Sequence, residues 1–208
     1  MTTLAIMLAE IQADTERTST SDVTAMRSKI VAAIRQYQPK RFWFNESRSV
    51  TFNTVASTVE YSFTTIGTEF YQIDGAFLTD GSDVIEVERV NYTEIENATA
   101  STSTAPYAYA YVAKTLRLYP SPDAIYPVRL TGHIKIAAPA ADGEADNIWM
   151  TEAYDLIMCR AKAELYAHRW EDAANAQIMR AAEGDALRRL LSATDGKVSL
   201  GHLEATDF

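Results

Sequence analysis

The sequence has little cysteine, little glycine and no long apolar run. Its one cysteine, Cys159, excludes a disulfide within the chain and a zinc site built from several cysteines. Only 8 glycines occur among 208 residues, and none falls in a phosphate-binding pattern such as G-x-G-x-x-G or the P-loop. No apolar stretch approaches the roughly 20 residues of a membrane-spanning helix, so we expect no membrane partner.

Basic residues are outnumbered as well. Lysine and arginine total 19 against 28 aspartates and glutamates, which gives a net charge of −9. Proteins that hold nucleic acid concentrate positive charge on one face, so this balance argues against a DNA-binding or RNA-binding surface. The segment 1–4 lacks the basic region of a signal peptide, and we expect the chain to be made in the cytoplasm.

Residues with catalytic or metal-binding potential are dispersed. His133, His168 and His202 fall in different predicted elements without the spacing of metal ligands, and we expect His133 to be solvated. The acidic stretch 142–147 lacks the spacing of an EF-hand, and no serine lies in a G-x-S-x-G motif. The sequence therefore predicts no catalytic residue, no cofactor and no metal, and favours a non-enzymatic assembly module over an enzyme.

The spacing of the apolar residues changes at Pro39. Before it, they recur at i, i+3, i+4 and i+7, which predicts a helix over about 3–13 and a second one that begins after an N-cap at Ser19, Ser21 or Asp22 and ends at Pro39. After it, apolar and polar residues alternate, as in the strand predicted around Val50 and Phe52. Helical spacing returns from Thr151, and the last helix is expected to end near Gly196 and to bury one apolar face in the bundle: Ala174, Ile178, Ala181, Leu187, Leu190, Leu191.

These patterns predict an α+β fold. Helix pairs from 1–39 and 148–196 form a discontinuous four-helix bundle, and 40–147 forms an inserted antiparallel β sandwich or sheet. Residues 91–106 are expected to be an exposed loop, and 197–208 an extended C-terminal tail. The seam between helices and sheet is predicted at four aromatic residues: Phe42, Trp43, Phe44, Trp149.

A row of tyrosines allows two interpretations. Tyr107, Tyr109 and Tyr111 alternate with smaller residues, which predicts a strand with one aromatic face. Such a face could stack bases or sugars, or it could be part of a β core or of an interface between subunits. The negative charge of the chain favours the core or the interface.

Five segments resemble a known family. Arg41-Phe42-Trp43-Phe44-Asn45-Glu46 is the most distinctive, and 3–11, 30–38, 116–123 and 149–161 add to it in the same order. Together they resemble the head-to-tail adaptor, or connector, proteins of tailed bacteriophages. The resemblance covers roughly 1–196 by the order of elements, and does not cover the loop 91–106 or the C-terminal tail.

The resemblance implies a structural virion protein at the neck between head and tail. Such proteins form a homo-oligomeric ring, commonly twelve-fold, that docks under the portal protein, extends the DNA channel and attaches a tail or nozzle protein. Genomic DNA would pass through without sequence-specific contact, which agrees with the acidic composition. The ring body would come from the helices, and the β region would face the tail components.

The tail 197–208 is a candidate for binding the portal. Leu200, Leu203 and Phe208 are apolar residues in a segment without helical or strand spacing, and such a segment can become ordered on a partner. Two other functions remain open on the sequence. One is a different tail-completion or fibre-linked β module of a phage particle, and the other is an unrelated intracellular enzyme.

Overall fold

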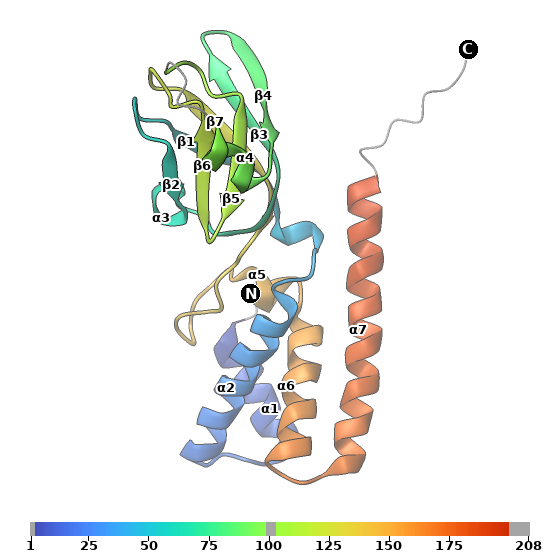
Figure 1. Ribbon diagram of the computed structural model, residues 1–208. Coiled ribbons are helices and arrows are strands. Elements are labelled where there is room, and N and C mark those ends of the chain that lie inside the picture. Colours follow the sequence, from blue (N-terminus) through green and yellow to red (C-terminus); the bar gives the residue numbers. More distant parts are fainter. Residues whose placement is uncertain (1–2, 99–102, 200–208) are drawn as a thin grey trace, which may run out of the picture. The chain divides into compact units, whose positions relative to one another are not determined.

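The computed structural model describes residues 3–98 and 103–199, and these form two compact units (Figure 1). The helical unit comprises Met1–Phe44 and Ile136–Phe208, so it draws on both ends of the chain. The β unit is the continuous segment Asn45–Lys135. Each unit has its own cluster of buried apolar residues, and the two clusters have no residue in common.

The helical unit contains five α-helices and a short 3-10 helix among the described residues: α1 (Leu4–Thr15), α2 (Thr20–Tyr37), η1 (Trp43–Asn45), α5 (Ile148–Thr151), α6 (Tyr154–His168) and α7 (Ala173–Ser199). The side chains of Thr3 and Ser19 accept hydrogen bonds from backbone N–H groups in the first turns of α1 and α2. The apolar spacing that predicted α1 is confirmed, because the four residues at i, i+3, i+4 and i+7 are buried: Leu4, Met7, Leu8, Ile11.

The helices do not form the predicted four-helix bundle. α6 packs against α2 and α7, and also contacts α1, whereas α7 runs alongside α6 at one side of the array (Figure 1). Among the described side chains of α7, Ala186 and Leu190 belong to the buried apolar cluster, and Leu187 packs against it. The face of α7 that the sequence predicted to be buried is instead largely exposed, with Ile178 at 58% and Leu191 at 37%.

Polar side chains fix α7 to the other helices. The hydroxyl of Tyr37, at the end of α2, donates a hydrogen bond to Glu183 of α7. Arg160 of α6 lies 3.6 Å from the Glu183 carboxylate and 3.0 Å from that of Glu164. Burial, followed by the hydrogen bond to Glu183, raises the pKa of the Tyr37 hydroxyl well above its ordinary value, so this donor keeps its proton.

Tyr37→Phe is expected to lower the free energy of unfolding by about 1–2 kcal/mol, because the buried carboxylate of Glu183 loses a donor. Chemical denaturation followed by circular dichroism measures the change. Tyr107→Phe is the matched control, since Tyr107 is 55% exposed, and it should change stability by less than about 0.5 kcal/mol. Equal effects of the two substitutions would contradict the structural role of the Tyr37 hydroxyl.

The β unit is one seven-stranded sheet with the order β1-β7-β3-β4-β5-β6-β2. The strands are β1 (Glu46–Asn53), β2 (Glu60–Ser62), β3 (Phe70–Asp80), β4 (Asp83–Arg89), β5 (Ala108–Val112), β6 (Thr115–Tyr119) and β7 (Pro127–Ile134). Neighbouring strands are antiparallel except β4 and β5, which pair in parallel at Glu88 and Arg89. The short helices α3 (Phe63–Ile66) and α4 (Tyr92–Asn97) lie in its connections.

The sheet curls into a half-barrel around its apolar cluster, so the prediction of a sandwich is wrong, as is that of the bundle, while the α+β class is right. The curl brings the two edge strands together, since the rings of Phe52 on β1 and Tyr61 on β2 have centroids 5.0 Å apart. The parallel pair was not predicted because residues 91–106 were expected to be a loop. Helix α4 lies in this connection, after which β5 runs parallel to β4. Ile95 of α4 is buried.

Gly132 of β7 lies where β3 is irregular. It pairs with Ile73, and the register of β3 shifts between Ile73 and Gly75. A Cβ atom at position 132 would lie 2.2 Å from the carbonyl oxygen of Gln72, and the φ of Gly132 is +153°. The next residue, His133, is 3% exposed with its ring 5.1 Å from that of Tyr71, so the prediction of a solvated histidine is wrong.

Candidate interaction surfaces

Four aromatic residues that the sequence singled out form one cluster inside the helical unit. Phe42 stacks on Phe44 with ring centroids 5.3 Å apart, and Trp149 meets both rings edge-on at 6.3 and 5.2 Å. Trp43 packs edge-on against Phe44 at 5.8 Å. Phe42 and Trp149 are fully buried, so these two residues contribute to the core of the helical unit and cannot contact a partner.

Hydrogen bonds connect this cluster to the segment that follows β7. The indole N–H of Trp149 donates to the carbonyl oxygen of Ile136 at 3.1 Å, and the amide of Gln38 donates to the same oxygen at 2.8 Å. The side chain of Asn147 accepts from the backbone N–H of Trp149 at 3.2 Å and thereby caps α5. The orientation of Trp149 is therefore fixed by polar contacts as well as by packing.

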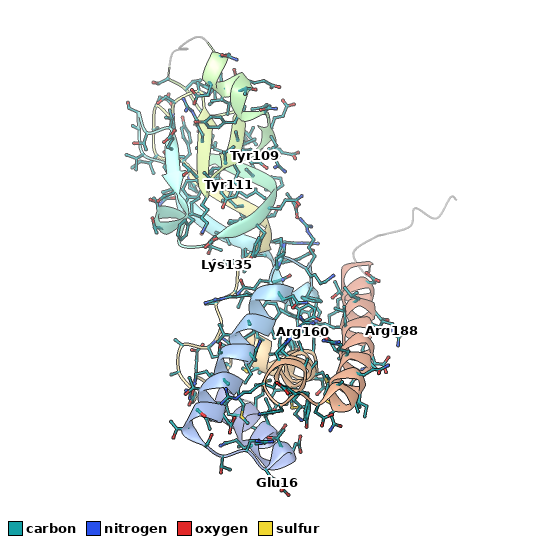
Figure 2. All side chains as sticks on the ribbon, turned by 60° about the horizontal axis from the view of Figure 1, so that its bottom comes forward. Glu16, Tyr109, Tyr111, Lys135, Arg160 and Arg188 are labelled. Carbon is teal, nitrogen blue, oxygen red and sulfur yellow. The ribbon has the colours of Figure 1, made fainter. Side chains whose placement is uncertain are left out.

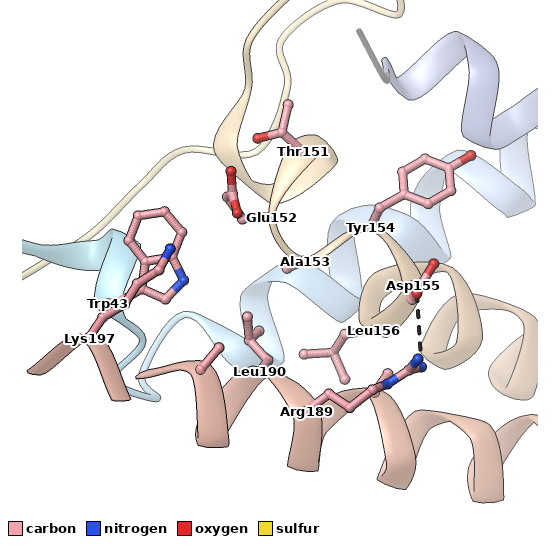
Figure 3. A pocket seen from close by; sticks show the side chains of 12 residues that line it. Trp43, Thr151, Glu152, Ala153, Tyr154, Asp155, Leu156, Arg189, Leu190 and Lys197 are labelled. Atoms are coloured by element: carbon pink, nitrogen blue, oxygen red, sulfur yellow. Dashed lines mark ion pairs between the residues drawn. The ribbon is translucent and has the colours of Figure 1, made fainter. Parts of the chain in front are cut away.

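Trp43 is the member of the cluster that reaches the surface. It lines a pocket of about 360 Å³ between α5, the start of α6 and the last turns of α7 (Figure 3). The ammonium group of Lys197 lies 3.2 Å from the centroid of the Trp43 ring, a cation–π contact. The backbone N–H of Trp43 also donates to Thr194 at 3.3 Å. α7 therefore continues to Ser199 instead of ending near Gly196, as the sequence predicted.

Charged residues alternate with apolar ones around this pocket. Asp155, in the first turn of α6, faces Arg189 of α7 at 3.9 Å (Figure 3). Both side chains are more than half exposed, so this pair contributes little to stability. A pocket with a half-buried tryptophan, a lysine and an ion pair suits contact with another protein.

The outer side of α7 is a second exposed surface. Its residues Ala174, Ile178 and Ala181 fall at i, i+4 and i+7 on the side opposite the buried residues of α7, and all three are exposed. Arg188 projects from this side, away from the other helices (Figure 2). A helix of 27 residues that buries one stripe leaves most of its surface for a neighbour.

The tyrosine row belongs mainly to the core of the β unit. Tyr109 is 1% exposed, and the hydroxyl of Tyr111 donates to the carbonyl oxygen of Phe70 at 3.0 Å (Figure 2). Burial raises the pKa of both hydroxyl groups. Only Tyr107 is exposed enough to stack on a ligand, so the three tyrosines do not form a stacking platform.

Three predicted partner-binding residues, Leu200, Leu203 and Phe208, lie outside the described residues. Within 3–98 and 103–199, no group of three or more histidine, cysteine, aspartate or glutamate side chains is arranged to hold a metal ion. None of the helices described is long and apolar enough to cross a membrane. The outer side of α7 has the apolar spacing of a buried helix face, so the sequence alone does not identify it as an exposed surface.

Comparison with known proteins identifies the family of the chain. No curated protein matches it. The family model described as SU10 adaptor protein matches residues 2–201, which is nearly the whole chain. The chain therefore belongs to the SU10 adaptor protein family, a family of structural head-to-tail adaptor proteins of bacteriophages.

Proposed function

We propose that this chain is the subunit of a ring that docks under the portal, extends the DNA channel and attaches the tail at the neck of the virion. The ring is twelve-fold, as is common among the connector proteins that the sequence resembles. The chain's membership of a bacteriophage adaptor family supports this role. The observation that carries the proposal is the exposed apolar stripe of α7, because a long helix that leaves Ile178 58% exposed has surface suited to another subunit.

Ring closure needs two different patches on each subunit, since a head-to-tail contact joins unlike surfaces. The outer side of α7 supplies one patch. The exposed side of α1 supplies the other, with Ile6 39% exposed among the small residues Ala5, Ala9 and Ala13. Small residues let helix backbones approach closely, so we propose that α7 of one subunit packs on α1 of the next.

The charge of the chain suits a channel through which DNA moves. A net charge of −9 repels the phosphate backbone, so DNA would pass without being held.

Portal docking is assigned to the segment 197–208, with Leu200, Leu203 and Phe208 as anchors. Deletion of 200–208 is expected to abolish binding to portal rings while the unfolding transition stays unchanged, and unaltered binding would remove this assignment.

Ile178→Glu is expected to reduce ring assembly on the portal at least tenfold, because it places a charge in the proposed contact between subunits. The free energy of unfolding should change by less than about 0.5 kcal/mol, since the side chain is exposed. Ile125→Glu is the matched control: Ile125 is 70% exposed in the β unit, and its substitution should leave assembly intact.

The experiment that tests the function is assembly of the purified chain with the cognate portal protein. Native mass spectrometry and electron microscopy give the number of copies and the symmetry. Twelve copies in a ring under the portal are expected. A three-fold or six-fold complex with tail proteins and no portal binding would instead support a tail-completion or fibre-linked module.

A further inference from the structure

One part of β4 has a neighbouring strand on a single side. β3 pairs with Asp83–Val87 in unbroken register, whereas β5 pairs only with Glu88 and Arg89. The hairpin of β3 and β4 thus extends past the end of β5 (Figure 1). Within the part of the chain that the structure describes, no strand pairs with the other side of Asp83–Val87.

Backbone groups on that side are directed toward the place of an absent strand. The N–H of Glu88 donates to the carbonyl oxygen of Tyr107, the residue before β5, at 2.8 Å. Peptide groups alternate in direction along a strand, so those of Val84 and Glu86 point the same way as that of Glu88 and away from β3. They leave two N–H groups and two carbonyl groups available to an added strand.

Apolar side chains of β4 are exposed beside the stretch that has no neighbouring strand. Val87 and Ile85 lie on the same face of the strand because they are two residues apart. Val87, beside the paired residues, is 2% exposed, whereas Ile85 is 40% exposed and Val84 on the other face is 62% exposed. A strand beside Asp83–Val87 would extend the apolar core of the β unit over Ile85 and cover part of Val84.

The other two edges of the sheet face one another. Phe52 of β1 and Tyr61 of β2 are in ring contact, and the Tyr61 hydroxyl accepts from the backbone N–H of Val55 at 3.0 Å. The curl of the sheet therefore brings these two edges into contact within the unit. The open edge is the stretch of β4, and exposed strand edges are sites where extended segments add by backbone hydrogen bonding.

The acidic residues of the β3–β4 hairpin favour a basic segment as the added strand. Asp80, Asp83, Glu86 and Glu88 give the hairpin an acidic character, and neither Glu86 nor Glu88 has an ion-pair partner among the described residues. Arg129 on β7 pairs with Phe77 on β3, and Phe77 pairs in turn with Glu86 on β4. The Arg129 guanidinium lies 4.5 Å from the centroid of the Phe77 ring. A basic residue opposite Glu86 would continue this row. A second β4 would place like charges together.

We propose that the open edge of β4 at Asp83–Val87 is a strand-addition site for an extended segment of a tail-side protein, in which lysine or arginine alternates with valine or isoleucine. The identification of the partner as a tail protein rests on the proposed adaptor function. The acidic hairpin excludes nucleic acid as the occupant.

A synthetic ten-residue peptide of alternating lysine and valine is the probe. Added to the full chain, it is expected to slow amide hydrogen exchange at Val84 and Glu86, whereas a glutamate–valine peptide of the same length should not. Glu86→Pro removes an outward-pointing donor and leaves the hydrogen bonds between β3 and β4 intact, so it should weaken binding at least tenfold. Equal binding by this variant, or protection elsewhere, would overturn the inference.

A charge reversal keeps the test decisive if the proline variant fails to fold. The double variant Glu86→Lys with Glu88→Lys should prefer the glutamate–valine peptide, and an unchanged preference for the lysine peptide would also overturn the inference. Assembly on the portal separates the two proposals. A chain that forms the ring without binding the peptide refutes the strand-addition site alone, and a chain that forms no ring refutes the adaptor function.

Discussion

Trp149→Ala is expected to lower the free energy of unfolding of the helical unit by about 3–5 kcal/mol, the range for removal of a fully buried aromatic side chain. The substitution removes ring contacts with Phe42 and Phe44 and the hydrogen bond to Ile136. Denaturation followed by circular dichroism at the helix signal measures the loss. Hydrogen exchange should show lower protection in α5 and α6.

Trp43→Ala is the matched control, because Trp43 belongs to the same cluster but is only half-buried. Its cation–π contact with Lys197 is worth about 0.5–1 kcal/mol at a partly exposed site, so its substitution should cost less than half as much as that of Trp149. If both variants lost the same stability, the distinction between the buried core residue and the pocket residue would be wrong.

Gly132→Ala is expected to destabilise the β unit by on the order of 4 kcal/mol, since backbone strain and overpacking each cost about 1–3 kcal/mol. Its φ of +153° favours glycine, and a Cβ atom would overlap the carbonyl oxygen of Gln72 on the neighbouring strand. The β3–β7 pairing would have to open. Loss of amide protection in β3 and β7 is the measurement.

Gly143→Ala provides the comparison at constant chemistry. A Cβ atom at Gly143 meets no atom within 4 Å, and its φ is outside the strained range, so this substitution should be neutral within about 0.5 kcal/mol. A neutral Gly132→Ala would show that β3 can shift away from β7 at that point, contrary to the close approach seen in the structure.

Local spacing predicted the α+β class and the four long helices α1, α2, α6 and α7, but not the short helices or how the elements pack. Leu4, Met7, Leu8 and Ile11 are buried as their spacing indicates, because a helix with one apolar stripe has one face to cover. The same logic failed for α7, where Ile178 belongs to an apolar stripe that is exposed. Periodicity identifies an apolar face, but it does not say whether the chain itself or another subunit covers that face.

The sheet was harder to predict than the helices because strand partners are distant in the sequence. β1 pairs with β7 through Val50 and Leu130, and no local pattern specifies that partner. The burial of His133 depends on Tyr71 across the sheet, a neighbour that alternation of polar and apolar residues does not reveal. Helix α4 was missed because only Ile95 is buried in its six residues.

The division of the helical unit between the two ends of the chain has a consequence for biosynthesis. A ribosome completes 45–135 before it makes α6 and α7, so the β unit can fold during translation while the apolar face of α2 is still without its main packing partner, α6. Products of premature termination would lack the residues that bury Ile30, Ile34 and Phe42. A chain that ends before α6 therefore lacks part of the buried apolar cluster of the helical unit.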